Sequence, residues 1–224
     1  MTEANLAAQD PDEPFDLIRA DGTPLGRTKP RAAVHRDGDW HRSLHVWVAG
    51  VGDGGGAPWL LFQRRGPGKD TWPGRLDPTV GGHYRAGEGL VEALREVEEE
   101  IGVPATLADL RRLGTRVCVH DQEAGVRDHE VQDIFLRRDD RPLTAYRPNP
   151  AELAALVRLP LAPLLAFLVG HASTVPGEAL TPGATVPAPT VVAAADFIPD
   201  VDRYVYRVAV AVAAALRGDR HVAV

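Results

Sequence analysis

Apolar and polar residues alternate in several segments of the chain, and this pattern predicts β-strands. Asp21-Gly22 lies between two such segments, and these residues accept the positive φ of a tight turn, so a small hairpin is expected there. A second hairpin is expected around the glycine-rich turn at 51–56. The predicted strands are 15–18, 25–27, 44–49, 59–63, 112–119 and 130–137.

Apolar residues recur at helical spacing in two further segments. Between Leu90 and Ile101 they fall on one side of a helix, and Gly102 is suited to cap its C-terminal end. A second helix is expected over 200–217. Its small apolar residues would pack closely against a neighbour, and an association of two copies through this helix, a homodimer, is one arrangement that they allow.

The segment between these helices is less regular. Asn149-Pro150 is a helix start signal, so a helix is expected over 148–157 that continues into 163–169. The stretch 173–189 is rich in Pro, Thr and Ala and has little periodicity, which predicts a long loop or an ill-ordered insertion.

Strands mixed with helices indicate an α/β or α+β fold. Residues 1–14 read as a loose polar lead and residues 15–224 as one domain. Within that domain a core of about 15–170 is expected to be followed by a C-terminal loop and helix at 171–224. A chain of 224 residues can bury a large core in this way.

The composition is that of a soluble globular protein, with 25% charged and 44% hydrophobic residues and a net charge of −6. A single cysteine, Cys118, excludes an intrachain disulfide and favours a reducing compartment. The first residues lack the basic and apolar regions of a signal peptide, and the apolar stretches fall short of the ~20 residues that span a membrane. We therefore expect a cytoplasmic protein that does not bind membranes.

Nucleic-acid binding is not expected, because it requires a basic patch or stripe. The strongest positive cluster consists only of Arg64, Arg65 and Lys69. Its size suits a phosphate group, and guanidinium groups bind phosphate oxygens bidentately. These three residues are candidate substrate ligands, although arginines at the end of a strand are also commonly solvated. Trp72 nearby could stack on a base or simply fill the loop.

The helix at 90–101 carries Glu96, Glu99 and Glu100 at positions i, i+3 and i+4. Carboxylates so placed lie within about one turn and repel one another, which costs an isolated helix a few tenths of a kcal/mol per pair. A divalent cation among the oxygens would reverse that cost, and Mg²⁺ or Mn²⁺ suits oxygen ligands. The alternative is a solvated acidic helix face.

The same helix resembles the second half of the Nudix box, G-x5-E-x7-R-E-U-x-E-E-x-G-U, where U is a bulky aliphatic residue. Residues 95–103, REVEEEIGV, match that half without a gap. In the first half Gly82 and Glu88 have the right separation, but six residues lie between Glu88 and Arg95 where the family has seven. The role of Glu88 is therefore open.

The Nudix resemblance implies an α/β/α sandwich with a mixed sheet between helices. It also implies that Glu96, Glu99 and Glu100 hold Mg²⁺ or Mn²⁺, with the carbonyl group near Gly82 as a further ligand, and that Arg95 orients a carboxylate. In this family the cation bridges a diphosphate and prepares water for attack at phosphorus. Glu130 is a candidate for an additional carboxylate ligand from outside the box.

Several motifs resemble the isopentenyl-diphosphate isomerase branch of the Nudix superfamily: LHVW at 44–47, WPG at 72–74, GH at 82–83 and DHEV at 128–131. That enzyme has a cysteine just before the Gly-His pair, where this chain has Gly81. Isomerase activity is therefore not expected. The histidines and acidic residues that bind a second metal in the isomerase are matched by His45, His83, Asp128 and Glu130, with their purpose open.

The sequence thus predicts a metal-dependent Nudix hydrolase that cleaves the diphosphate linkage of a small molecule of the nucleoside diphosphate type. Arg95, Glu96, Glu99 and Glu100 are the expected catalytic residues. One alternative is a ligand-binding or regulatory module that keeps the fold and has lost turnover because of the shortened box. A dimerisation protein built on the last helix is another, and isomerase activity is a further, weaker alternative.

Overall fold

The computed structural model describes residues 9–52, 55–121, 125–199 and 201–224. Most of the loose lead expected at 1–14, two residues of the turn at 51–56 and the first residue of the helix expected at 200–217 lie outside these ranges. Helices occur at α1 (Arg31–Asp37), α2 (Leu90–Ala93), α3 (Arg95–Ile101), α4 (Leu161–Leu168) and α5 (Tyr204–Leu216), with short 3-10 turns at Leu107–Asp109, Leu143–Ala145 and Ala194–Asp196.

A nine-stranded mixed sheet runs through the described part of the chain in the order β11-β10-β9-β4-β3-β8-β7, with β5 added to β4 and β6 added to β3. β3 and β8 pair in parallel, whereas all other pairs of neighbouring strands in this sheet are antiparallel. The strands are β3 (Trp40–Val51), β4 (Pro58–Arg65), β5 (Leu76–Pro78), β6 (Val80–His83), β7 (Leu110–Asp121), β8 (Arg127–Arg138), β9 (Leu153–Pro160), β10 (Thr174–Leu180) and β11 (Ala188–Ala193).

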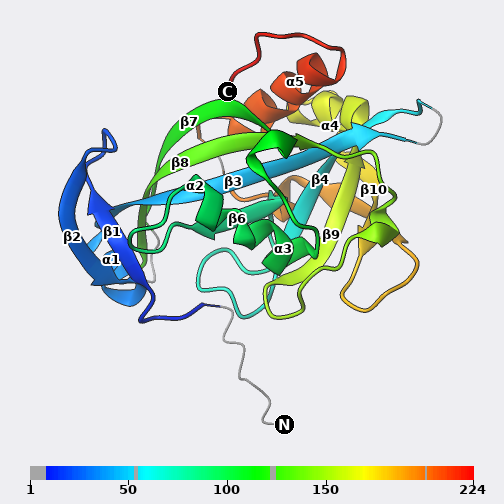
Figure 1. Ribbon diagram of the computed structural model, residues 1–224. Coiled ribbons are helices and arrows are strands. Elements are labelled where there is room, and N and C mark those ends of the chain that lie inside the picture. The colour runs from blue at the N-terminus through cyan, green and yellow to red at the C-terminus, as the bar shows by residue number, and fades with distance from the viewer. Residues whose placement is uncertain (1–8, 53–54, 122–124, 200) are drawn as a thin grey trace.

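A separate two-stranded hairpin of β1 (Pro14–Ile18) and β2 (Pro24–Pro30) precedes the sheet, as the Asp21-Gly22 turn predicted. Phe15 on β1 is fully buried and packs against Val34 of α1. The hairpin and α1 therefore form a small unit beside one end of the sheet (Figure 1).

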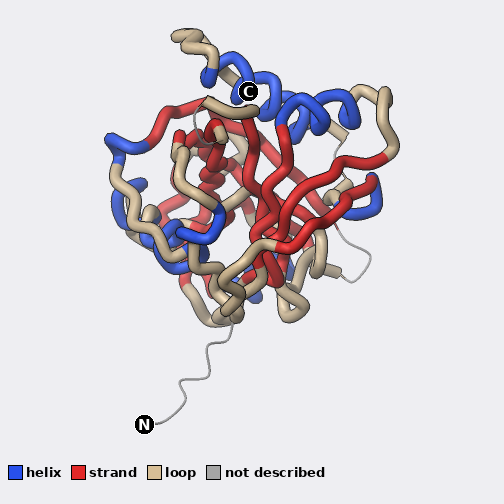
Figure 2. The backbone as a smooth tube through the Cα atoms, turned by 90° about the vertical axis from the view of Figure 1, so that its right-hand side faces the viewer, coloured by secondary structure: helices blue, strands red, loops and turns tan. Residues whose placement is uncertain are grey.

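The central strands bury both of their faces, and successive side chains enter different cores. Trp47 and Phe62 belong to a core with α4 and α5, whereas Val46 and Leu61 belong to a core with α2 and α3. Figures 1 and 2 show the two layers, with α4 and α5 together on one side of the sheet. The expected α/β/α sandwich with a mixed sheet and a C-terminal helix is confirmed. None of the described helices is long and apolar enough to cross a membrane.

The helix predicted over 148–157 was wrong, because this segment contains β9, which pairs with β4 on one side and β10 on the other. Ala155 and Val157 enter one core while Leu153 and Leu156 enter the other. A strand buried on both faces shows no apolar and polar alternation, so its sequence does not distinguish it from a helix. The backbone of Asn149 makes a tight turn instead of starting a helix.

The long loop expected at 173–189 was also wrong, since β10 and most of the hairpin to β11 occupy this region. β11 lies at the edge of the sheet, where a strand tolerates proline. A Cβ atom on Gly177 would lie 2.6 Å from the carbonyl oxygen of Arg158 and from a methyl group of Leu159. The glycine therefore permits close approach of β10 to β9, and is not a loop signal here.

We expect Leu156→Ala to lower the free energy of unfolding by about 2–5 kcal/mol, because it leaves a cavity at a fully buried position of β9. Leu107→Ala is the matched control, since the Leu107 side chain is 49% exposed. Urea unfolding followed by circular dichroism measures both variants. Equal losses in the two variants would contradict the central position of β9.

Candidate functional site

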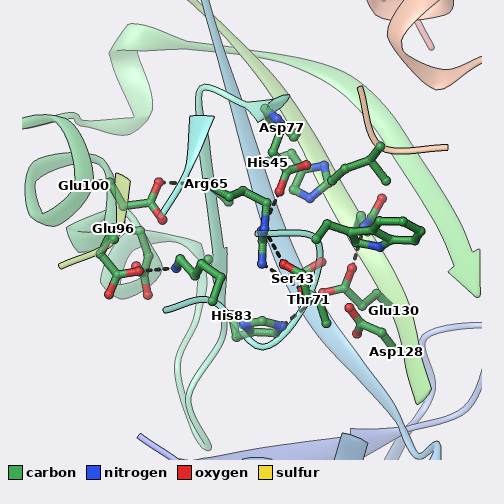
Figure 3. A pocket seen from close by; sticks show the side chains of 18 of the residues that line it. Ser43, His45, Arg65, Thr71, Asp77, His83, Glu96, Glu100, Asp128 and Glu130 are labelled. Carbon is green, nitrogen blue, oxygen red and sulfur yellow. Dashed lines mark hydrogen bonds and ion pairs between the residues drawn. The ribbon is translucent and has the colours of Figure 1, made fainter. Parts of the chain in front are cut away.

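A cavity of about 460 Å³ opens between the sheet, α3 and the N-terminal hairpin unit. Its walls combine acidic, basic and aromatic side chains that lie far apart in the sequence. Figure 3 shows Glu96 and Glu100 at one end of this cavity and Asp128 and Glu130 at the other. The site therefore has two acidic ends.

Glu96 and Glu100 project from α3 because Val97 and Ile101 turn the apolar side of this helix into the core. Glu100 is only 2% exposed. Its Oε2 atom accepts hydrogen bonds from the Gln63 side-chain amide at 3.1 Å and from the Gly81 backbone N–H at 3.3 Å. The Glu100 carboxylate of the expected acidic face is thus buried against β4 and β6 and is not simply solvated.

A glycine is required at position 82, where β6 lies against α3. A Cβ atom on Gly82 would lie 2.3 Å from Cγ of Glu96, a distance that no side chain could accept without moving the carboxylate. The backbone of β6 therefore lies directly against the Glu96 side chain. This close approach explains why the strand that precedes the helix carries glycine here.

Arg95 lies among three carboxylates of the same segment. Its guanidinium nitrogens lie 2.9 Å from Glu96, 3.4 Å from Glu88 and 4.0 Å from Glu99. Glu88 therefore reaches Arg95 although the segment between them is one residue short. Glu99 lies at the cavity wall with half of its side chain exposed.

Burial changes the protonation of both inward-facing carboxyl groups. Burial raises the pKa of Glu96 to about 7, even though Arg95 lowers it. Burial also raises the pKa of Glu100 well above its ordinary value, against the opposing charge of Lys69. Buried carboxylates need a compensating positive charge to stay ionised, so these oxygens fit Mg²⁺ or Mn²⁺, which take oxygen ligands.

Two of the three candidate phosphate ligands line this cavity. The Arg65 guanidinium donates to Asp77 at 2.6 Å and to the Thr71 hydroxyl group at 2.8 Å, and Lys69 is ion-paired with Glu152. Arg64 does not line the cavity.

Arg64 instead lies beside the C-terminal part of the chain. Its guanidinium donates to the Gly74 carbonyl group at 2.9 Å and to Asp196 at 2.8 Å. The structure thus brings Arg65 and Lys69 together with the acidic helix and leaves Arg64 outside.

A group of histidines occupies the other end of the cavity. Ligand atoms of His35, His41, His83 and Asp128 all lie within 4.8 Å of one another. The Nε2 atoms of His35 and His41 and Oδ1 of Asp128 are buried, and none of them forms a hydrogen bond with a described residue. Buried, unpaired nitrogen and oxygen donors at this spacing fit a divalent transition metal.

The charge of this group is set by burial. Burial lowers the pKa of His41 to about 4, so its ring is neutral near pH 7 and can act as a ligand. Burial also raises the pKa of Asp128 well above its usual range, and the Glu130 charge adds to that rise. Burial alone would raise the pKa of Glu130, but hydrogen bonding and charge from His83 hold it well below.

Glu130 lies with the histidines. Its Oε1 atom is 3.1 Å from Nε2 of His83, and its Oε2 atom accepts a hydrogen bond from the Gln132 amide at 2.5 Å. Figure 3 shows it across the cavity from Glu96 and Glu100.

His45 does not belong to the group of His35, His41, His83 and Asp128. Its Nδ1 atom lies 2.9 Å from the Tyr204 hydroxyl group, which also accepts a hydrogen bond from Trp47. His35 on α1 and His41 at the start of β3 take part instead. Sequence reasoning missed them because neither residue falls in a motif or in a predicted element. Their signal was two histidines flanking the short turn at Gly38, between α1 and β3.

A family model described as NUDIX domain matches residues 41–176, which include the acidic helix and most of the cavity wall. The chain belongs to the Nudix family. This result confirms the resemblance first drawn from residues 95–103. In the sequence, His35 precedes the matched segment and Tyr204 follows it. Both residues nevertheless lie at the site.

Several curated Nudix proteins are similar to this chain. An uncharacterized Nudix hydrolase of Clostridium acetobutylicum is 31% identical over 158 residues, 70% of this chain and 74% of that protein. Nudix hydrolase 3 of Arabidopsis thaliana is 35% identical over 154 residues, 66% of this chain but only 19% of the plant protein.

An isopentenyl-diphosphate Delta-isomerase of Paenarthrobacter aurescens is 34% identical over 141 residues, which cover 62% of this chain and 71% of that enzyme. Among solved structures, a Deinococcus radiodurans protein shares the fold, with a TM-score of 0.52 at 24% identity over 70% of this chain and 89% of that chain. The expected relation to both hydrolases and isomerases of the Nudix superfamily is thus confirmed.

The thiol of this Nudix chain lies on a different element from the Gly-His pair. Gly81 on β6 occupies the position where the isomerase resemblance calls for cysteine, while Cys118 lies on β7. Cys118 is buried in this strand. Burial raises its pKa to about 12, so the thiol stays protonated near neutral pH.

In metal-free protein we expect Glu96→Gln to raise the melting temperature more at pH 8 than at pH 5. The folded-state pKa of Glu96 is raised to about 7, so its contribution to stability is present below pH 4.5 and is lost as the pH rises through 7. The gain in free energy of unfolding caused by Glu96→Gln should be larger at pH 8 than at pH 5 by on the order of 2 kcal/mol. Thermal unfolding in a chelating buffer measures it, and a pH-independent difference would contradict the raised pKa.

Proposed function

We propose that this chain is a metal-dependent Nudix hydrolase that cleaves the diphosphate linkage of a small molecule of the nucleoside diphosphate type. The observation that carries the proposal is that the buried Glu100 and the 16% exposed Glu96 side chain line the same cavity as Arg65 and Lys69. Acidic oxygens for a cation and basic groups for phosphate oxygens are the two requirements of diphosphate cleavage. The similarity to curated Nudix hydrolases supports the same activity.

The side chains of α3 would hold the cation through Glu96, Glu99 and Glu100. When bound, a divalent cation screens the charge of a diphosphate and makes water a usable nucleophile near neutral pH. Arg95 keeps the Glu96 carboxylate in place through its 2.9 Å contact. Arg65 would bind a phosphate oxygen, since its guanidinium is already fixed by Asp77 and Thr71.

We expect Glu96→Gln, Glu99→Gln and Glu100→Gln each to lower turnover at least tenfold, because each change removes an anionic oxygen from the cation site. Melting temperatures should show that all three variants remain folded. Glu178→Gln is the control, since Glu178 on β10 is ion-paired with Arg158 on β9 and lies outside this cavity. Full activity in all three α3 variants would rule out the assignment.

The substrate test is a panel of nucleotides, nucleotide sugars, dinucleotides and coenzyme A, each with and without Mg²⁺. Release of phosphate or nucleotide only in the presence of Mg²⁺ would support a hydrolase. Thermal shifts without product release would instead favour the ligand-binding module, because a ligand that binds the folded state stabilises it even without turnover.

A second cation is supported at the other end of the cavity, where His35, His41, His83 and Asp128 lie together. Imidazole nitrogens favour transition metals over Mg²⁺. We expect metal-free protein to bind two equivalents of Mn²⁺, and His41→Gln to bind one. Paramagnetic resonance of free Mn²⁺ gives the stoichiometry, and two equivalents in His41→Gln would exclude His41 as a ligand.

A further inference from the structure

His45 is a polar residue of the cavity wall that neither of the two cation sites uses. It lies on β3, is 8% exposed and lines the cavity. Burial lowers the pKa of its imidazole ring, so the ring is neutral near pH 7. A neutral imidazole has one N–H donor and one acceptor nitrogen. The nitrogen that carries the hydrogen therefore decides what His45 offers to the cavity.

Tyr204, the first residue of α5, decides between the two nitrogens. Its hydroxyl oxygen accepts a hydrogen bond from the indole N–H of Trp47 at 2.9 Å, because an indole nitrogen can only donate. Burial raises the pKa of Tyr204 well above its ordinary value, so the hydroxyl group keeps its own hydrogen. Among the described residues, the acceptor within reach of that hydrogen is Nδ1 of His45, 2.9 Å away.

A hydroxyl group that donates to Nδ1 leaves the imidazole hydrogen on Nε2. The opposite tautomer would direct the N–H groups of His45 and Trp47 at one oxygen, and the buried Tyr204 hydrogen would lack an acceptor in the described part of the chain. A buried donor without a partner is unfavourable. His45 therefore presents an N–H group at Nε2, and neither of its nitrogens has a lone pair left for a metal ion.

A second polar group adjoins His45 on the same face of β3. Ser43 comes two residues earlier in the strand, so its side chain projects to the same side. It is 2% exposed, lines the cavity, and its Oγ atom forms no hydrogen bond with any described residue. A buried hydroxyl group in this state lacks the hydrogen bonds that water would give it. The pair indicates that a hydrogen-bonding ligand approaches β3 from the cavity.

The neighbouring strand β6 shows where this pair lies in the cavity. Ser43 is paired with His83 of the histidine group, and His45 is paired with Gly81, whose N–H donates to Glu100. Figure 3 shows both residues of β3 between the two acidic ends. A molecule that spans the two cation sites therefore passes Ser43 and His45.

We propose that the Nε2–H group of His45 and the Ser43 hydroxyl group bind oxygen atoms of the substrate's diphosphate, with Tyr204 as the positioning residue that fixes the imidazole tautomer. The inference rests on the proposed function, because it takes the substrate to be a diphosphate. Charged oxygen atoms accept stronger hydrogen bonds than neutral ones. Donors that are fixed before the ligand arrives lose less entropy on binding. Helix α5, which follows the matched Nudix segment, thereby takes part in recognition.

The tautomer is tested by long-range proton–nitrogen correlation spectra of metal-free protein, isotopically labelled in histidine, at pH 8. His45→Gln identifies the His45 signals, and the exposed His171 is the reference ring. We expect a protonated Nε2 and an unprotonated Nδ1 in His45. Tyr204→Phe should shift the Nδ1 resonance of His45 but not that of His171. A hydrogen on Nδ1, or an unmoved Nδ1 resonance in Tyr204→Phe, would overturn the role of Tyr204.

Contact with the diphosphate is tested by calorimetric titration with methylenediphosphonate in the presence of Mg²⁺, because this probe resists hydrolysis. We expect Ser43→Ala to weaken binding at least threefold. Its melting temperature without metal should stay the same or rise, since the removed hydroxyl group has no partner among the described residues. Weaker binding together with undiminished stability is a result that a merely structural serine would not give.

Two amide variants test His45 with the same probe. His45→Gln can place an amide N–H close to the Nε2 position, whereas the side chain of His45→Asn is too short to reach it. We expect His45→Asn to weaken methylenediphosphonate binding at least fivefold and His45→Gln to weaken it less. His171→Asn is the control and should bind like the parent chain. Equal losses in His45→Asn and His45→Gln would contradict a donor at Nε2.

Other outcomes separate this inference from the proposed function. His45→Gln should bind as many equivalents of Mn²⁺ as the parent chain, and one equivalent fewer would make His45 a metal ligand and overturn the inference. Unchanged methylenediphosphonate binding in Ser43→Ala and His45→Asn, with turnover lost in Glu100→Gln, would overturn the contact and leave the hydrolase site standing.

Absence of methylenediphosphonate binding in the parent chain would also overturn the inference. Absence of turnover on the whole substrate panel would overturn the proposed function as well. Melting curves verify that each variant is folded, and Ser43→Ala carries the comparison if His45→Asn is unfolded.

Discussion

The burial of two carboxyl groups of α3 against a glycine-rich strand is the constraint on which the rest of the site depends. Glu96 touches the backbone at Gly82, and Glu100 accepts a hydrogen bond from the neighbouring Gly81. Burying carboxylates is unfavourable unless their charge is balanced. The elements around α3 therefore have to bring positive groups or polar donors to this point, and the loop after β4 brings Lys69 to it.

The cationic side chains of the cavity are already engaged by carboxylates. Arg65 is paired with Asp77, Arg31 with Asp70, and Lys69 with Glu152. Such pairs fix the direction of each cationic group before a ligand arrives, which lowers the entropy lost on binding. Arg65 is held further by Thr71, which accepts two hydrogen bonds from its guanidinium group.

Local patterns in the sequence were sufficient for the acidic helix and its glycines, because the spacing of Glu96, Glu99 and Glu100 is a property of one short segment. They were not sufficient for Glu152, whose position depends on pairing of β9 with β4 and on docking of the preceding turn onto α3. His35 was missed for a similar reason, since the packing of α1 beside β8 brings it to His41, His83 and Asp128.

The site also extends beyond the segment that the family model matches, 41–176. His35 comes from the N-terminal unit, and Tyr204 begins the C-terminal helix α5. The Tyr204 hydroxyl group contacts both His45 and Trp47 of β3, so α5 is attached to the strand that runs along the cavity. Because this attachment is made by buried polar contacts, the position of α5 and the shape of the cavity wall depend on each other.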